Sequence, residues 1–98
     1  MTNLWEETIE FLKENDKTFE DVLFIQGEDF KVTKENFEIV AKNTDYNSSF
    51  GAQHVATDLV LVGDGWWIER CEYDGSEWWE FKTIPTEKSK VVPIFFLR

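Results

Sequence analysis

Cysteine, histidine and long apolar runs are scarce in this 98-residue chain. Its one cysteine, Cys71, cannot form an intramolecular disulfide, and with the one histidine, His54, it supplies too few ligands for a zinc site. No apolar run approaches the roughly 18 residues that cross a membrane, and the N-terminal MTNLWEETIE is unlike a secretory signal. We therefore expect a cytoplasmic protein with no disulfide, metal site, cofactor or membrane span.

Basic residues are also few, at ten against twenty acids, which gives a formal net charge of −10. Seven acids and two lysines lie in residues 1–21, whereas the last thirteen residues carry three bases and one acid. Such a charge repels phosphate backbones, so direct binding of nucleic acid is not expected. It fits a protein partner with a basic surface, or imitation of nucleic acid toward a protein that binds it. The alternative is an acidic surface that serves solubility alone.

An amphipathic helix is predicted over residues 3–15. Asn3, with Glu6 three residues later, resembles a capping box, and apolar residues recur at helical spacing after it. One side of this helix is predicted to be an exposed acidic face, formed by Glu6, Glu10 and Glu14.

A small hairpin and a second helix are predicted next. The apolar runs 22–25 and 30–32 are β-favouring, and the turn between them is predicted to begin with Gly27. Thr33 is a suitable N-cap for a helix that continues to Ala41.

A polar loop is predicted over residues 43–51, attached to the body of the protein by Tyr46 and Phe50. A nucleophile activated by His54 would be Ser48, Ser49 or Cys71. None of them lies in the sequence context of a recognisable nucleophile, so catalysis of this kind is not expected.

Residues 60–82, VLVGDGWWIERCEYDGSEWWEFK, carry the strongest fold signal. Asp64-Gly65 and Asp74-Gly75 favour type I′ turns, which require positive φ at both central residues. Two such turns ten residues apart predict a three-stranded antiparallel meander. We therefore predict one α+β domain over residues 1–98, with an antiparallel sheet of four or five strands packed against two helices.

Strand alternation sorts the meander into two faces. Leu61, Ile68 and Phe81 should form an apolar row on the core face, joined by Leu59, Trp66 and Trp79. The opposite face is the candidate binding surface, because it combines aromatic rings with acids. Its members are Trp67, Glu69, Tyr73, Trp78 and Glu80. The alternative is that these rings form a second core.

The second turn leaves two registers open. A two-residue loop sets Glu69 opposite Glu80, whereas a four-residue loop sets it opposite Lys82, and the charge pairing favours the longer loop. Arg70 is expected to lie over Trp79 or against an acid of the sheet.

The C-terminal segment, residues 91–97 (VVPIFFL), is strongly apolar for a chain end. Pro93 allows only an edge position in a sheet. We expect this segment to dock, either over the aromatic face or against a second copy, and a homodimer through either surface is therefore a possible arrangement.

Glu80-Phe81-Lys82 loosely matches the Glu-x-Lys element of metal-dependent nucleases, with Asp58 or Asp64 as the upstream acid. Asp64 is placed in a turn and Asp58 at a strand end, and the net charge opposes a nucleic-acid substrate. An enzyme is therefore not expected, and a nuclease is kept as an alternative.

The stretch ATDLVLVGDGWWIERCEYDGSEWWEFKTIP resembles a small uncharacterised family encoded by phages and prophages of Gram-positive bacteria, and the resemblance extends more weakly to TFEDVLFIQGEDFKVTKENFEIVA. It implies no activity, only the context of an accessory protein in a bacterial cytoplasm. We expect a non-enzymatic protein that binds a basic host or phage protein, such as an inhibitor of a nucleic-acid-binding defence enzyme by charge mimicry. A homo-oligomeric assembly protein is a further alternative.

Overall fold

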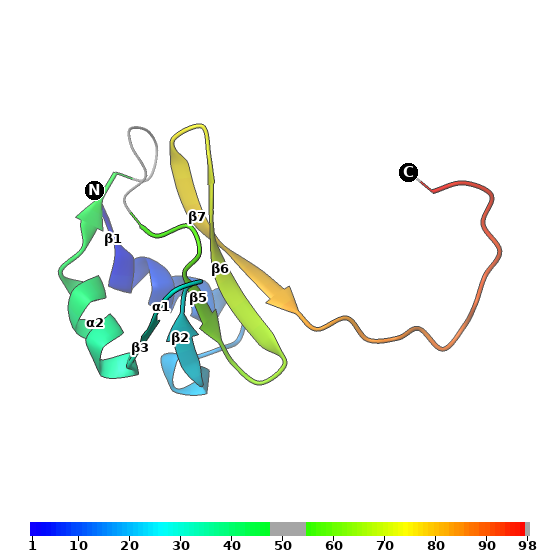
Figure 1. The fold of residues 1–98 in the computed structure, drawn as a ribbon, viewed down its shortest axis with the longest axis horizontal. Coiled ribbons are helices and arrows are strands. Elements are labelled where there is room, and N and C mark those ends of the chain that lie inside the picture. The colour runs from blue at the N-terminus through cyan, green and yellow to red at the C-terminus, as the bar shows by residue number, and fades with distance from the viewer. Residues whose placement is uncertain (48–54, 98) are drawn as a thin grey trace.

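The computed structural model describes residues 1–47 and 55–97 and has an α+β fold, as predicted. A five-stranded antiparallel sheet has the strand order β3-β2-β5-β6-β7, and a two-stranded sheet pairs β1 with β4 (Figure 1). The elements are β1 (Thr2–Asn3), α1 (Leu4–Glu14), the 3-10 helix η1 (Phe19–Asp21), β2 (Phe24–Gln26), β3 (Lys31–Val32), α2 (Lys34–Lys42), β4 (Asp45–Tyr46), β5 (Val60–Val62), β6 (Trp66–Tyr73) and β7 (Ser76–Thr83).

The first helix begins where the sequence predicts, because the Asn3 side chain accepts a hydrogen bond from the backbone N–H of Glu6 at 3.1 Å. Leu4, Thr8 and Leu12 form its buried face. The acidic face, Glu6, Glu10 and Glu14, is exposed as predicted. Thr33 caps the second helix in the same way, by accepting from the N–H of Asn36 at 3.0 Å.

The turn of the β2–β3 hairpin lies one residue later than predicted. Gly27 donates its backbone N–H to the carbonyl of Phe30 at 2.9 Å, so Glu28 and Asp29 form the two-residue loop. Gly27 is needed for close packing, because a Cβ there would lie 2.2 Å from the Phe30 ring and 2.8 Å from a carboxylate oxygen of Asp58. The prediction that the turn begins with Gly27 was wrong, because this glycine is required by close packing and not by the turn.

The meander and its core row are confirmed, since Leu61 pairs with Ile68 and Ile68 pairs with Phe81. The two Asp-Gly turns differ from each other. Asp74 and Gly75 have φ values of 51° and 86°, as a type I′ turn requires, whereas at the first turn only Gly65 has positive φ. The prediction of a type I′ turn was therefore wrong for the first turn.

The two-residue loop at Asp74-Gly75 also sets the register of the long hairpin. Tyr73 pairs with Ser76, and Glu69 consequently pairs with Glu80. The longer loop that the charge pairing favoured is wrong, because a pair of residues adapted to a type I′ turn outweighs one exposed ion pair.

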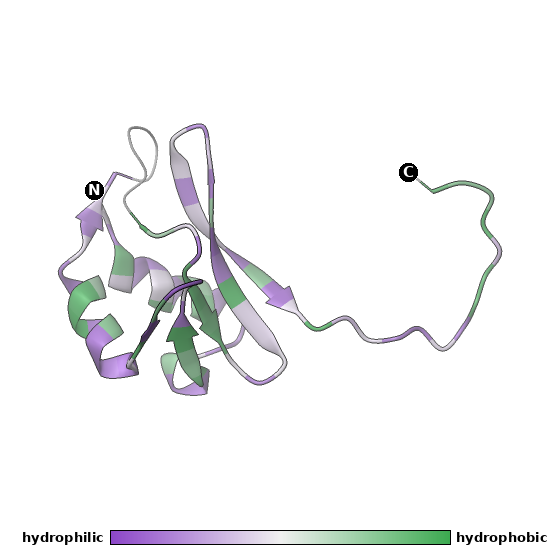
Figure 2. Cartoon of the chain, viewed as in Figure 1, coloured by the Kyte–Doolittle hydropathy of each residue, from purple (hydrophilic) through white to green (hydrophobic). Residues whose placement is uncertain are grey.

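The helices and the sheet enclose one hydrophobic core (Figure 1). Its sheet side includes Ile25, Leu61 and Ile68, each 0% exposed, and its helix side includes Leu12 and Ala41. Hydrophobic colour is strong on β2 and β5, appears in bands on α2 and along the β6–β7 hairpin, and returns along the C-terminal segment (Figure 2).

Tyr46 attaches the segment after α2 to the body, as predicted. Thr2 pairs with Tyr46 in the small sheet, and the Tyr46 side chain is 0% exposed. The other predicted anchor, Phe50, lies outside the described residues, as do Ser48, Ser49 and His54.

Within the single chain the C-terminal segment does not dock over the aromatic face, so that alternative was wrong, whereas docking against a second copy stays a prediction. Beyond Ile84 the described chain runs away from the body (Figure 1), and Val91 and Phe95 are 94% and 93% exposed. The cause is the place where β7 ends. Directly after the strand, Ile84 donates its N–H to the carbonyl of Gly65, in the turn between β5 and β6. The chain is therefore already leaving the sheet, and Pro85 has no N–H with which to continue the pairing.

No helix among residues 1–47 and 55–97 is long and apolar enough to cross a membrane.

Candidate functional site: an open aromatic and acidic sheet face

The structure brings the five predicted binding residues together on one face of the β6–β7 hairpin. Both helices pack against the other face, and the C-terminal segment does not cover this one. We call it the open sheet face and define it as Trp67, Glu69, Cys71, Tyr73, Trp78, Glu80 and Lys82. Tyr73 and Lys82 are exposed and the other five are half-buried. The alternative of a second core beneath the C-terminal segment is therefore wrong.

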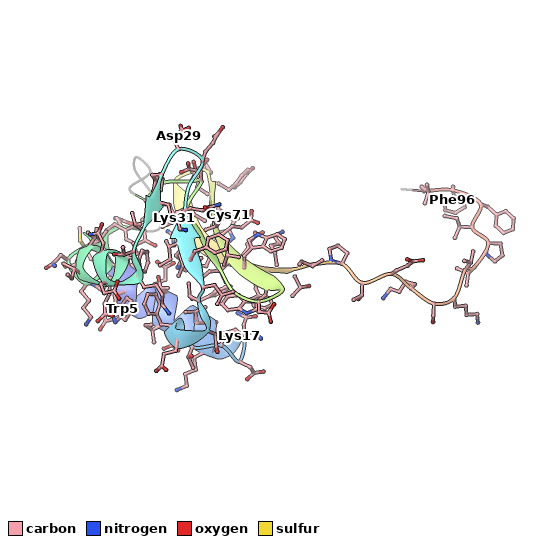
Figure 3. All side chains as sticks on the ribbon, turned by 60° about the horizontal axis from the view of Figure 1, so that its bottom comes forward. Trp5, Lys17, Asp29, Lys31, Cys71 and Phe96 are labelled. Atoms are coloured by element: carbon pink, nitrogen blue, oxygen red, sulfur yellow. The ribbon has the colours of Figure 1, made fainter. Side chains whose placement is uncertain are left out.

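A row of mainly polar residues, interrupted by Val60, crosses this face of the whole sheet. Successive strand pairs align Lys31, Gln26, Val60, Glu69 and Glu80 from β3 to β7. Figure 3 labels Lys31, which begins this row on β3, and Cys71, which lies two residues from Glu69 along β6. The face thus presents opposite charges at its two ends, with the acids on the long hairpin.

Two Trp–Glu pairs form the centre of the open sheet face. The indole N–H of Trp67 donates to Oε1 of Glu69 at 2.8 Å, and that of Trp78 donates to Oε2 of Glu80 at 3.0 Å. Each pair joins residues i and i+2 of one strand, which share a face. The carboxylates are thereby held beside aromatic rings, in fixed orientations.

The two carboxylates lie directly opposite each other, since Glu69 pairs with Glu80. Like charges in this position destabilise a sheet. Glu80 is partly compensated by Lys82, whose Nζ lies 3.4 Å from its Oε1. The Trp78 N–H, followed by Lys82 and Cys71, lowers the pKa of Glu80, so this carboxyl group remains an anion at neutral pH.

Cys71 lies beside the two acids, opposite Trp78, and is not set up as a nucleophile. Burial, followed by the charge of Glu80 and a hydrogen bond to it, raises the pKa of the Cys71 thiol. A raised pKa lowers the thiolate fraction on which nucleophilic attack depends.

A second polar cluster, of which the sequence predicted only the contacts of Arg70, lies inside the protein. Arg70 on β6 donates to Oε2 of Glu7 at 3.2 Å, to Oε1 of Glu77 at 3.3 Å and to the hydroxyl of Tyr46 at 2.8 Å. The Tyr46 hydroxyl donates in turn to Glu7. We call Glu7, Tyr46, Arg70 and Glu77 the Arg70 network.

The Arg70 network joins α1, β4, β6 and β7. The Arg70 side chain is 1% exposed, and its guanidinium carbon lies 4.9 Å from the centre of the Trp79 ring, so both predicted kinds of contact are present. One signal in the sequence could have revealed it: strand parity places Arg70 and Glu77 on the core face, where unpaired charges are costly.

The pKa of the Tyr46 hydroxyl provides a test of the Arg70 network. Burial, followed by the hydrogen bond to Glu7, raises the pKa of Tyr46 to about 12. Between pH 10 and 12 the unfolded chain loses this proton and the folded chain keeps it, so stability falls as pH rises through that window, by up to about 2–3 kcal/mol. We expect ultraviolet titration of a Tyr73→Phe variant, whose only tyrosine is Tyr46, to show ionisation displaced above pH 10. Ionisation at the ordinary tyrosine pKa would contradict the hydrogen-bonded burial.

The acids of the nuclease alternative are not gathered into one site. Glu80 and Lys82 share the open sheet face, but the Asp58 carboxylate accepts from the Glu28 N–H at 2.7 Å and so belongs to the β2–β3 turn. Asp64 lies in the first Asp-Gly turn, five residues from the Glu69 that faces Glu80, or about 15 Å along the strand. Over the part of the chain that the structure describes, no three His, Cys, Asp or Glu side chains are grouped to hold a metal ion.

A pocket of about 240 Å³ lies between α2 and residues 55–59. Its lining is mainly apolar and includes Phe30, Phe37, Val40 and Leu59, and none of the described residues that line it is titratable.

No protein-family model, curated protein or solved structure matches the chain. The fold and the site together define a small α+β protein whose antiparallel sheet is covered by helices on one face and presents aromatic rings and acids on the other.

Proposed function

We propose that this chain is a non-enzymatic binding protein whose open sheet face holds a basic segment of another protein. The observation that carries the proposal is the pair of Trp–Glu units, Trp67 with Glu69 and Trp78 with Glu80. Aromatic rings beside acids match an arginine side chain, which can stack on an indole and donate to a carboxylate. Among the residues that the structure describes, the pocket behind α2 offers no acid or base that would favour catalysis instead.

The opposed acids explain why a cation would be favoured. Glu69 and Glu80 face each other across two strands, and Lys82 neutralises only part of that charge. A guanidinium placed between the carboxylates would relieve their repulsion and donate to both of them. Part of the binding free energy would thus come from strain that is already present in the free protein.

The acidic face of α1 would speed the encounter with the basic partner rather than form part of the interface at the open sheet face. Glu6, Glu10 and Glu14 lie opposite the buried side of α1, which packs on the covered face of the sheet. They therefore point away from the open sheet face. A net charge of −10 still speeds the approach of a basic partner from any direction.

We further propose the context of a phage or prophage accessory protein in a bacterial cytoplasm, with a nucleic-acid-binding host protein as its target. The resemblance at residues 56–85 and the excess of acids support this context. Binding at the basic groove of such a protein would exclude its nucleic acid.

The test compares two variants that remove the same charge. We expect Glu69→Gln with Glu80→Gln to weaken binding of an arginine-rich peptide at least about tenfold, because charged partners of hydrogen bonds are lost. Glu10→Gln with Glu14→Gln should weaken it less than about threefold, since only long-range attraction changes. Titration followed by tryptophan fluorescence measures both. Equal losses in the two variants would show that net charge alone is responsible and would refute the site.

The mimicry proposal has its own test, in which a basic nuclease replaces the peptide. Its inhibition should weaken steeply with salt, and weaken further when Glu6, Glu10 and Glu14 are all replaced by lysine. Inhibition that does not depend on salt would rule out charge mimicry and leave the open sheet face to be judged on the peptide titration.

A further inference from the structure

The two edges of the five-stranded sheet differ in length. β3 has two residues, which suits an edge, because short edge strands resist unwanted pairing. β7 has eight residues, and no described strand lies on its outer side. A long edge strand is a ready template for another strand.

The outward backbone groups of β7 can be assigned. Ile84 donates its N–H to the carbonyl of Gly65 at 3.2 Å, so even-numbered residues of this strand bond toward β6. In an antiparallel ladder the alternate residues then direct N–H and C=O to the other side. They include Trp79, Phe81 and Thr83, within the register that runs from Trp66–Thr83 to Tyr73–Ser76.

We propose that β7 pairs antiparallel with β7 of a second copy, about a two-fold axis at Phe81. This register sets Trp79 opposite Thr83 of the partner subunit and allows about six new backbone hydrogen bonds. It joins the two five-stranded sheets edge to edge, with the helices of both copies on one side. The proposal shares Glu80 and Lys82 with the open sheet face, but it is tested by dimerisation and not by peptide binding, so either proposal can fail without the other.

Charge complementarity selects this register. Pairing centred on Phe81 places Glu80 opposite Lys82 of the partner subunit, and the symmetry repeats that contact. Centring on Glu80 would oppose two glutamates, and centring on Trp79 would leave Lys82 opposite Ser76 of the partner subunit. Opposite charges across two strands stabilise a sheet and like charges destabilise it.

Apolar contacts and the strand end fit the same register. Ile84 is 64% exposed in the single chain and would pack beside Trp78 of the partner subunit on the open side of the joined sheet. Phe81, which stacks on Trp66 at 5.9 Å, would meet its own symmetry mate on the core side. Pro85 has no N–H and ends the pairing there.

The test uses charge exchange across the axis, measured by analytical ultracentrifugation over a concentration series. Lys82→Glu and Glu80→Lys should each raise the dimer dissociation constant at least about tenfold, since each turns two attractive contacts into repulsive ones. Mixing these two single variants should restore dimers, and so should the double exchange Glu80→Lys with Lys82→Glu. An interface that does not place residue 80 of one subunit opposite residue 82 of the other predicts no such rescue.

Two backbone variants separate strand pairing from other contacts. Thr83→Pro removes an outward donor without touching the β6–β7 ladder and should dissociate the dimer, whereas Thr83→Ala should not. A chain ending at Pro85 should dimerise as the full chain does; loss of the dimer would assign the contact to the apolar C-terminal segment. A protein that stays monomeric at all concentrations, or dimers without rescue by charge exchange, would overturn the proposal.

Discussion

Replacing Arg70 by methionine is expected to lower the free energy of unfolding by about 3–5 kcal/mol. The guanidinium lies between Glu7 and Glu77, and Arg70 and Glu77 are 4% and 5% exposed. Methionine fills much of the same volume but leaves two carboxylates and the Tyr46 hydroxyl without their shared partner. For a domain whose total stability is about 5–15 kcal/mol, this is a large part of the whole. Urea denaturation followed by tryptophan fluorescence measures it.

The matched control is Lys82→Met, which removes an ion pair on the surface. Its Nζ lies 3.4 Å from Glu80 with both side chains more than 40% exposed, so the expected change is below about 1 kcal/mol. A second control adds Glu7→Gln and Glu77→Gln to Arg70→Met, which should recover part of the loss because no unpaired charge remains buried. If Arg70→Met cost no more than Lys82→Met, the Arg70 network would not contribute to stability.

Much of this fold could be predicted because it depends on local chemistry. Asp74-Gly75 has the φ values that a type I′ turn requires, and once the turns are placed, period-two alternation assigns every residue of β6 and β7 to a face. The caps of the helices, Asn3 and Thr33, are likewise set by contacts three residues away. The open sheet face was predictable for the same reason, since its members lie on two strands joined by one turn.

The Arg70 network could not be predicted in full, because its members are far apart in the sequence. Glu7 and Arg70 are separated by 63 positions, and their meeting depends on how α1 crosses the sheet. Alternation along β6 does place Arg70 inside, but it does not say which acid neutralises it. The register of the long hairpin stayed open for a different reason, because charge pairing favours the longer loop while the Asp74-Gly75 turn favours the shorter one, and the turn decides where Glu69 lies.

The adjacent tryptophans of β7 should separate stability from binding. Trp79 is 3% exposed, donates its indole N–H to the Thr8 hydroxyl at 3.1 Å and covers the Arg70 guanidinium. We expect Trp79→Ala to lower the free energy of unfolding by about 3–5 kcal/mol, from lost packing and the cavity left behind. Trp78 is half-buried on the open sheet face, so Trp78→Ala should cost about 1 kcal/mol or less.

Peptide affinity should depend more on Trp78 than on Trp79, the opposite of the order expected for stability. Trp78→Ala removes a ring and the indole donor that orients Glu80, so we expect the arginine-rich peptide to bind at least about tenfold more weakly. Trp79→Phe keeps an aromatic core and is a better partner for this comparison than Trp79→Ala, and it should bind nearly as the parent does. Urea denaturation and peptide titration of the same preparations give both quantities. Two results would contradict the proposal: normal peptide binding by Trp78→Ala, or a peptide affinity that falls in parallel with stability at both positions. The open sheet face would then be only an exposed surface of the fold, because a binding face must depend on residues that stability does not need.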